Sequence, residues 1–185
     1  MATATKRWTI DEVRALPDDG NRYEVVDGEL LVTPAPSWRH GDAVLALVKR
    51  LLPYLEAHRL GHLKVAPQDL LLGDNVLVQP DVFVVPLVSG RTPRSWDEVR
   101  RLLLAIEVLS PGTARADRTV KRALYQRHAV PEYWIVDTDA RLVERWRPAD
   151  DRPEIIAALI DWQPDPTHPS MIIDLPSYFA EVTGD

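Results

Sequence analysis

Two acidic side chains interrupt stretches that otherwise predict buried β-strands. Glu107 lies inside the apolar run 102–109, and Asp81 begins a strand that stays apolar up to Val85. Burying a carboxylate costs on the order of several kcal/mol unless it is paired or binds a metal ion. Two such acids on neighbouring strands suit a hard divalent cation, which prefers oxygen ligands and leaves part of its shell to water and a substrate phosphate. Asp81 and Glu107 are therefore candidate functional residues.

The segment after Glu107 predicts a helix that carries a lysine toward the same place. A Ser-Pro-Gly stop ends the strand, apolar residues recur at helical spacing over 113–129, and 132–137 predicts another strand. A strand-helix-strand unit implies parallel strands with the helix covering one face of the sheet. We expect Lys121 to lie above the end of the strand that bears Glu107. An ion pair with Asp117, worth a few tenths of a kcal/mol, is the alternative role for this lysine.

The N-terminal region predicts a helix followed by a β-hairpin. Residues 9–12 have the form of a capping box, and an Asp-Gly turn between two apolar-rich stretches predicts a hairpin over 22–33. A two-residue turn makes Glu24 and Glu29 diagonal neighbours on one face. Paired acids on a hairpin are most often exposed, so this pattern alone assigns neither of them a function.

A long helix and a second hairpin come next. Apolar spacing predicts an amphipathic helix from about 41 to 58, which Pro53 should kink or break. His40 is expected just ahead of it, where a histidine is more often a cap or surface residue than a ligand. The second hairpin turns at 73–75, and its return strand is expected to run through Asp81 to Val85, which would place Asp69 on the same side as Asp81.

The chain predicts one domain, residues 1–185, without repeats or a dividing linker. Its parts are an N-terminal helix and hairpin (9–34), a core (41–137), and C-terminal strands with a short helix (141–183). Apolar positions near Trp146 and Trp162 look exposed, and they could serve a homodimer or fill the core.

Composition excludes several classes of site. The sequence has no cysteine, which removes disulfides, thiolate metal sites and cysteine nucleophiles. It also lacks the GxGxxG, GxxxxGK, HExxH and GxSxG patterns, so nucleotide-binding, zinc-peptidase and serine-hydrolase chemistry fit poorly. No apolar stretch is long enough for a signal peptide or a membrane span, and we expect a cytoplasmic protein.

The net charge of −6 is unevenly distributed. Residues 91–128 contain 9 Lys and Arg against 4 Asp and Glu, which leaves 13 against 24 for the rest. A basic segment around a carboxylate site is compatible with a phosphate-backbone partner. A solvated helix face explains the charge equally well.

The order of these motifs resembles the restriction-endonuclease-like PD-(D/E)XK nuclease superfamily, and more closely its bacterial Uma group. Pro80-Asp81 on one strand and Glu107-Val108-Leu109 on the next follow the superfamily pattern. The resemblance covers about residues 9 to 180. It rests on these stretches, in order: RYEVVDGELL, the loop ending in His40, VAPQDLLL, NVLVQPDVFVV, IEVLSPGT, the array of Asp117, Lys121 and Tyr125, and VPEYWIVD.

The resemblance implies an α/β fold with an αβββαβ core, in which a mixed sheet is flanked by helices and extended by the N-terminal hairpin. It makes Asp81 and Glu107 ligands of Mg²⁺, or of Mn²⁺, with the Val108 carbonyl as a third ligand. It makes Lys121 the residue that orients water or stabilises charge. The usual superfamily lysine falls at Leu109 here, a departure that is matched in the Uma group by a lysine on the following helix.

The resemblance also assigns further residues to motif positions of the family. Glu24 corresponds to an accessory acid, and the other matched motif positions, without a derived role, are Asp69, Glu29, His40 and Tyr125. The expected activity is metal-dependent hydrolysis of DNA. One alternative is a catalytically silent module that binds nucleic acid through Arg115, Arg118 and Arg122. A third reading is a structural partner protein in which Asp81 and Glu107 are simply paired acids.

Overall fold

The computed structural model describes residues 6–185. The helices and strands are, in chain order, α1 (Ile10–Arg14), β1 (Arg22–Val26), β2 (Glu29–Thr33), α2 (Trp38–His58), β3 (His62–Val65), β4 (Leu70–Gly73), β5 (Val76–Val78), β6 (Val82–Val85), β7 (Leu104–Val108), α3 (Ala114–Ala116), α4 (Arg122–Arg127), β8 (Tyr133–Asp137), β9 (Leu142–Trp146), β10 (Glu154–Ile156), β11 (Leu159–Trp162), β12 (Met171–Asp174) and α5 (Leu175–Thr183). A 3₁₀ turn spans Trp96–Glu98, and a π-helical turn at Asp117–Lys121 joins α3 to α4.

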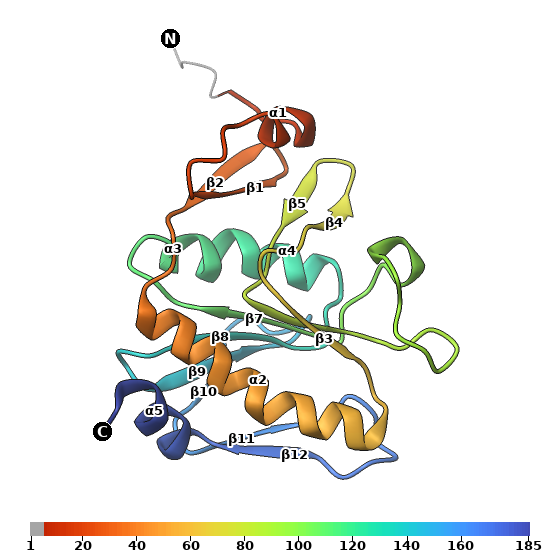
Figure 1. Ribbon diagram of the computed structural model, residues 1–185, viewed down its shortest axis with the longest axis vertical. Helices are drawn as coiled ribbons and strands as arrows, with labels where there is room; N and C mark the ends of the chain where they lie inside the picture. Colours follow the sequence, from red (N-terminus) through yellow and green to blue (C-terminus); the bar gives the residue numbers. More distant parts are fainter. Residues whose placement is uncertain (1–5) are drawn as a thin grey trace.

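A six-stranded mixed sheet forms the centre of the molecule, in the order β10-β9-β8-β7-β6-β3 (Figure 1). Strands β7 and β8 are parallel, with Glu107 opposite Ile135, while β6 runs antiparallel to β7. The parallel pair confirms the predicted strand-helix-strand unit. With α2 before β3 and the hairpin β4-β5 inserted ahead of β6, the sequence order αβββαβ of the core is also confirmed.

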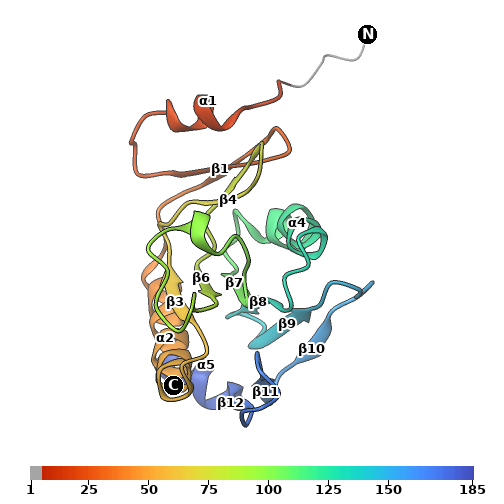
Figure 2. The same cartoon turned by 90° about the vertical axis from the view of Figure 1, so that its right-hand side faces the viewer.

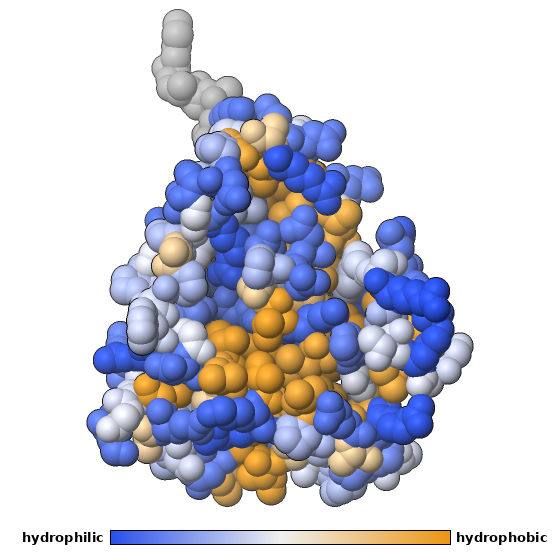
Figure 3. Space-filling view, viewed as in Figure 1, coloured by the Kyte–Doolittle hydropathy of each residue, from blue (hydrophilic) through white to orange (hydrophobic). Residues whose placement is uncertain are grey.

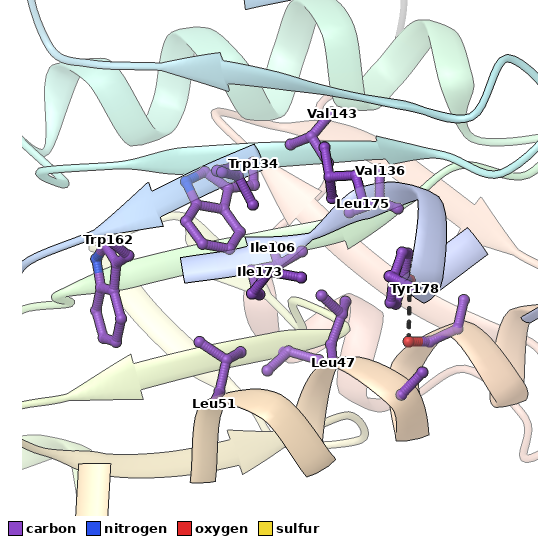
Figure 4. Packing of buried hydrophobic residues seen from close by; sticks show 14 of the residues in the cluster. Leu47, Leu51, Ile106, Trp134, Val136, Val143, Trp162, Ile173, Leu175 and Tyr178 are labelled. Atoms are coloured by element: carbon purple, nitrogen blue, oxygen red, sulfur yellow. Dashed lines mark hydrogen bonds between the residues drawn. The ribbon is translucent and has the colours of Figure 1, made fainter. Parts of the chain in front are cut away.

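Helices cover both faces of this sheet. Figure 2 shows α2 and α4 on opposite sides of it. On the α2 side, Leu47 and Leu51 pack with Ile106 and Trp134 of the sheet, and Tyr178 of α5 donates a hydrogen bond to the Ala43 carbonyl at 3.1 Å (Figure 4). Close apolar packing of this kind supplies most of the stability of such a domain.

A second, four-stranded sheet (β2-β1-β5-β4) lies above the first and carries α1 (Figure 1). The hairpin of β1 and β2 pairs Val26 with Glu29, as the Asp-Gly turn predicts. We expected one return strand running through Asp81, which is wrong, because β5 ends at Val78 in this sheet and β6 begins at Val82 in the other. Pro80 has no N–H to donate to a sheet ladder, and the chain changes sheets there.

Helix α2 differs from its prediction at both points of detail. It begins at Trp38 with Ser37 as the N-cap, so His40 lies in the first turn and not ahead of the helix. Pro53 does not break it, and the helix continues to His58. A proline removes one backbone hydrogen bond, and burial of the apolar stripe that includes Leu51 compensates for that loss.

Trp146 and Trp162 are buried, with 7% and 2% of their surface exposed. The two tryptophans themselves fill the core. Apolar side chains near them are exposed, as expected: Ile155 is 57%, Leu159 58% and Ile172 62% exposed. Leu45 and Leu52 of α2 are exposed as well, and Figure 3 shows apolar residues gathered where α2 lies in Figure 1. Within the described part of the chain, none of the helices has the length and apolar character needed to cross a bilayer.

Gly61 occupies a position where backbones approach closely. A Cβ built there would lie 2.8 Å from the Val85 carbonyl oxygen and 2.8 Å from a Val84 methyl group. Gly61→Ala should therefore displace β3 from β6 and lower the free energy of unfolding by about 1–3 kcal/mol, measured by urea denaturation. Gly41→Ala is the matched control, because nothing lies within 4 Å of its Cβ and alanine favours a helix. Equal stability of the two variants would contradict this account of the packing.

Candidate functional site

A lysine ammonium lies at the centre of a buried cluster of acids. Lys121 Nζ is 2.9 Å from Glu107 Oε1, 2.9 Å from Glu24 Oε2 and 3.7 Å from Asp117 Oδ1. The lysine side chain is 2% exposed, and none of the three acids exceeds that value. Lys121 therefore pairs with three carboxylates at once, which goes well beyond the single ion pair with Asp117 considered from the sequence.

Three separate elements bring these groups together. Glu24 comes from the middle of β1 in the upper sheet, and Glu107 from β7 in the central sheet. Asp117 and Lys121 lie at the two ends of the π-helical turn, which the sequence pattern did not predict. A π turn changes the angular spacing of side chains, and both residues are buried against the sheet here.

Further hydrogen bonds fix the orientation of the acids. Tyr125 donates its hydroxyl to Glu107 Oε1 at 3.4 Å, and Glu24 Oε1 accepts the Gln79 N–H at 2.6 Å. The Tyr133 hydroxyl donates to the Asp117 carbonyl oxygen at 3.1 Å. The hydrogen bonds that residues 6–185 give to Glu107 all reach Oε1, which leaves Oε2 available to a ligand.

Asp81 lies beside this cluster at the start of β6. Its Oδ2 accepts the Val108 N–H at 2.9 Å, and its Oδ1 is 3.0 Å from Arg22 Nη1 and 3.3 Å from His40 Nε2. Burial acts to raise the pKa of Asp81, but the contacts with His40, Arg22 and the Val108 N–H outweigh it and lower this pKa to about 2. Asp81 is therefore ionised at neutral pH.

The cluster contains more negative than positive charge. Four buried acids, Glu24, Asp81, Glu107 and Asp117, face two permanent cations, Lys121 and Arg22. Burial raises the pKa of Glu107 well above its usual value, and the nearby acids, Asp81 first among them, raise it further against the opposing effect of Lys121. Burial also raises the pKa of Asp117. Additional positive charge would thus be favourable here.

Asp81 opens onto a cleft of about 870 Å³ between the upper sheet and the core. His40 and Arg22 line it near Asp81, and Val108 forms part of its floor. Among the described residues, Glu107 and Lys121 do not line the cleft; Glu107 precedes Val108 on β7, and the Val108 N–H donates to Asp81. A substrate group in the cleft would meet Asp81 first.

Most of the predicted site residues meet at this point, and Glu29 does not. The cluster and its rim include Asp81, Glu107, Lys121, Glu24, Val108, His40 and Tyr125. Asp69 lies in the cleft wall and accepts a hydrogen bond from Gln79 Nε2 at 2.8 Å. Glu29 shares a face with Glu24, as the register predicts, but it is exposed because it lies beside the turn on the edge strand β2.

The predicted basic helix face is mostly committed to internal contacts. Arg118 Nε donates to Glu144 at 2.6 Å, and its Nη2 donates to Asp137 at 3.0 Å. Arg122 stacks over the Trp146 ring at 4.9 Å. Arg115 is exposed. Arg118 and Arg122 thus already have partners within the protein, and binding of nucleic acid through the three arginines stays a prediction.

Two site residues had no predicted role. Arg22 pairs with Asp81, and its position two residues before Glu24 on one strand could have placed it on the same face. Asp117 was part of the motif array, but only as an ion-pair partner of Lys121.

Within residues 6–185, no three carboxylate or histidine side chains already form a metal-binding group.

Comparison with known proteins gives two findings. A family model, Uma2, described as "Putative restriction endonuclease", matches residues 10–177. A solved structure described as a putative nuclease belonging to DUF820, from Anabaena variabilis, is similar at 21% sequence identity and a TM-score of 0.74. The match covers 95% of this chain and 99% of that one. A search of curated proteins found no match.

These findings fit the geometry of the core. At 21% identity the solved structure establishes a shared fold, which is the restriction-endonuclease-like fold. The family model spans nearly the whole described chain, from α1 to the start of α5. On that evidence the chain belongs to the Uma2 family.

Proposed function

We propose that this protein is a metal-dependent endonuclease that hydrolyses phosphodiester bonds of DNA. One observation carries the proposal: Asp81, just before β6, lines the cleft and accepts the N–H of Val108, whose neighbour Glu107 on the adjoining strand β7 pairs with the Lys121 ammonium. Membership of the Uma2 family and the nuclease-like fold support the same chemistry.

The residues present fit Mg²⁺ or Mn²⁺. Glu107 Oε2 is free of hydrogen bonds from the described residues, Asp81 is ionised, and the four acids of the cluster outnumber its two permanent cations. The Val108 carbonyl is the proposed third ligand. A shell completed by water and substrate phosphate is the usual way in which proteins bind Mg²⁺, so a ready-made group of three acids is not required. When bound, the metal ion would supply Lewis acidity and lower the pKa of a water molecule.

The protein's own groups have defined roles in this reaction. Lys121 holds Glu107 in place and opposes the rise in its pKa, which favours the charged form of the acid. Arg22 and His40 orient the Asp81 carboxylate toward the cleft. These positive groups beside the scissile phosphate would also stabilise the charge that develops in the transition state.

Cleavage of supercoiled plasmid by the purified protein tests the proposal. We expect nicking in Mg²⁺ or Mn²⁺, none in EDTA, and none by Asp81→Asn under any condition. Asp151→Asn makes the same chemical change at an exposed site and should keep full activity. Nicking that persists in Asp81→Asn would point to a contaminating nuclease and sink the assignment.

A silent nucleic-acid-binding module is the second candidate. It is favoured by the ion pair that Lys121 already makes with Glu107, together with the lack of three assembled metal ligands in residues 6–185. This function predicts salt-sensitive binding of DNA without turnover in either metal. Fluorescence anisotropy across a salt series, run beside the plasmid assay, separates the two candidates.

A further inference from the structure

The cleft offers little free positive charge to a nucleic acid. Arg14 lies 3.7 Å from Asp69, and Arg22 lies 3.0 Å from Asp81, so each arginine of the wall already faces an acid. Asp18 adds a further negative charge to the rim. Duplex DNA carries one charge per ~1.7 Å of axis, and proteins that grip it neutralise several phosphates with lysine and arginine. The cleft is poorly suited to that task.

The wall of the cleft is largely apolar. Val13, Val44 and Leu77 contribute side chains. Five prolines also line it: Pro17, Pro34, Pro36, Pro67 and Pro111. Proline restricts the backbone, so this surface is largely preformed. Apolar walls of this kind match the face of a nucleobase better than a phosphate backbone.

An aromatic side chain belongs to the same wall. Tyr23 lines the cleft and packs against the cluster that includes Val13 and Leu77 of the same wall. Its hydroxyl donates to Asp19 Oδ2 at 2.7 Å, which fixes the direction of the ring. Single-stranded nucleic acids bind proteins chiefly by stacking bases on such rings, with little sequence preference.

Resting on the proposed nuclease function, we infer that the cleft receives one unstacked nucleotide, so that the substrate is a single-stranded or locally unpaired nucleic acid and not a regular duplex. The volume of about 870 Å³ lies within the range of sites that enclose a drug-sized ligand, which is the size class of a nucleotide. The base contacts the proline-rich wall and Tyr23, while its phosphate lies at Asp81.

Three matched substrates test the inference: a single-stranded oligonucleotide, its fully paired duplex, and the same duplex with an internal unpaired loop. In Mn²⁺ the strand and the loop should be cut at least ~10-fold faster than the duplex, because unpairing and unstacking a base costs a few kcal/mol. In the looped duplex, cuts should fall at the loop. Binding of all three in Ca²⁺, followed by anisotropy, provides a readout that does not depend on turnover.

Variants of Tyr23 test the role of the ring. Tyr23→Ala should weaken binding of the single strand by roughly 5- to 150-fold, the equivalent of one lost stacking contact. Tyr23→Phe retains the ring, loses only the hydroxyl bond to Asp19, and should bind like the wild type. Thermal unfolding of both variants checks that the fold survives. Equal losses in the two variants would mean that the hydroxyl bond, and not stacking, matters.

The outcomes separate this inference from the proposed function. Asp81-dependent cleavage of the duplex at a rate equal to the single strand would leave the nuclease assignment standing and overturn the inference. Cleavage of none of the substrates would overturn the nuclease assignment. The anisotropy arm then decides, since duplex binding as tight as single-strand binding would overturn the inference as well.

Discussion

Replacing Glu107 with glutamine is expected to reduce metal-dependent cleavage by roughly 100-fold or more, since even residues behind a metal ligand change activity by 10- to 100-fold. The same change should leave the fold at least as stable as the wild type. Burial already raises the pKa of Glu107 and favours its neutral form, which glutamine mimics. Lys121 keeps two other partners, Glu24 and Asp117. Activity and stability should therefore change in opposite directions.

Calorimetric titration of Mn²⁺ and urea unfolding measure the two halves of this prediction. Metal affinity should fall along with the cleavage rate, while the free energy of unfolding holds or rises. Glu56→Gln, on the exposed side of α2, is the matched control and should change neither quantity. If Glu107→Gln binds Mn²⁺ as the wild type does, the ion is held elsewhere and the proposed ligand set is wrong.

Local signals in the sequence are enough to place Glu24 and Glu107 on their strands. The Asp-Gly turn sets the register of β1 and β2, and the apolar run around Glu107 predicts a strand with both faces buried. The Ser-Pro-Gly stop and the helical spacing after it imply that β7 and β8 are parallel. Each of these patterns involves residues that are close in the sequence. The structure confirms the hairpin register, the buried strand and the parallel strand pair.

Features that depend on contacts between distant segments were not predictable in this way. The π turn at Asp117–Lys121 has no separate sequence signal, because its residues also suit an ordinary helix. The sheet change at Pro80 is visible as a proline but not as a change of partner. Arg118 looked free in the sequence, and only the fold brings Glu144 within 2.6 Å of it.

The burial of Trp162 also depends on contacts between segments that are distant in the sequence. Its strand, β11, alternates exposed and buried positions, so the sequence fixes two faces but not which of them the core covers. The fold places β11 and β12 beside α2 and α5, and Trp162 then packs at 6.5 Å from the Trp134 ring. A tertiary contact therefore decides between a core residue and a dimer surface.

Replacing Lys121 with methionine should be the most destabilising single change at the site. The ammonium is the shared partner of Glu24, Glu107 and Asp117, and burial leaves these acids without solvent to compensate for its loss. Removing one partner of a buried ion pair typically lowers stability by about 3–5 kcal/mol. Methionine preserves much of the apolar stem, so the loss reports mainly on charge. Urea unfolding at neutral pH measures it.

Lys49→Met provides the matched control, because Lys49 forms an exposed pair with Glu181 and such pairs contribute about 0–1 kcal/mol. Mn²⁺ binding distinguishes the roles of Lys121. Loss of its ammonium removes one of the two described donors to Glu107 Oε1 and adds to the deficit of positive charge. Lys121→Met should therefore bind Mn²⁺ at least as tightly as the wild type, gain stability when the ion is added, and still fail to cleave DNA. If Lys121→Met is as stable as the wild type in the absence of metal, the account is wrong. The buried acids would then be neutral and would not need the lysine.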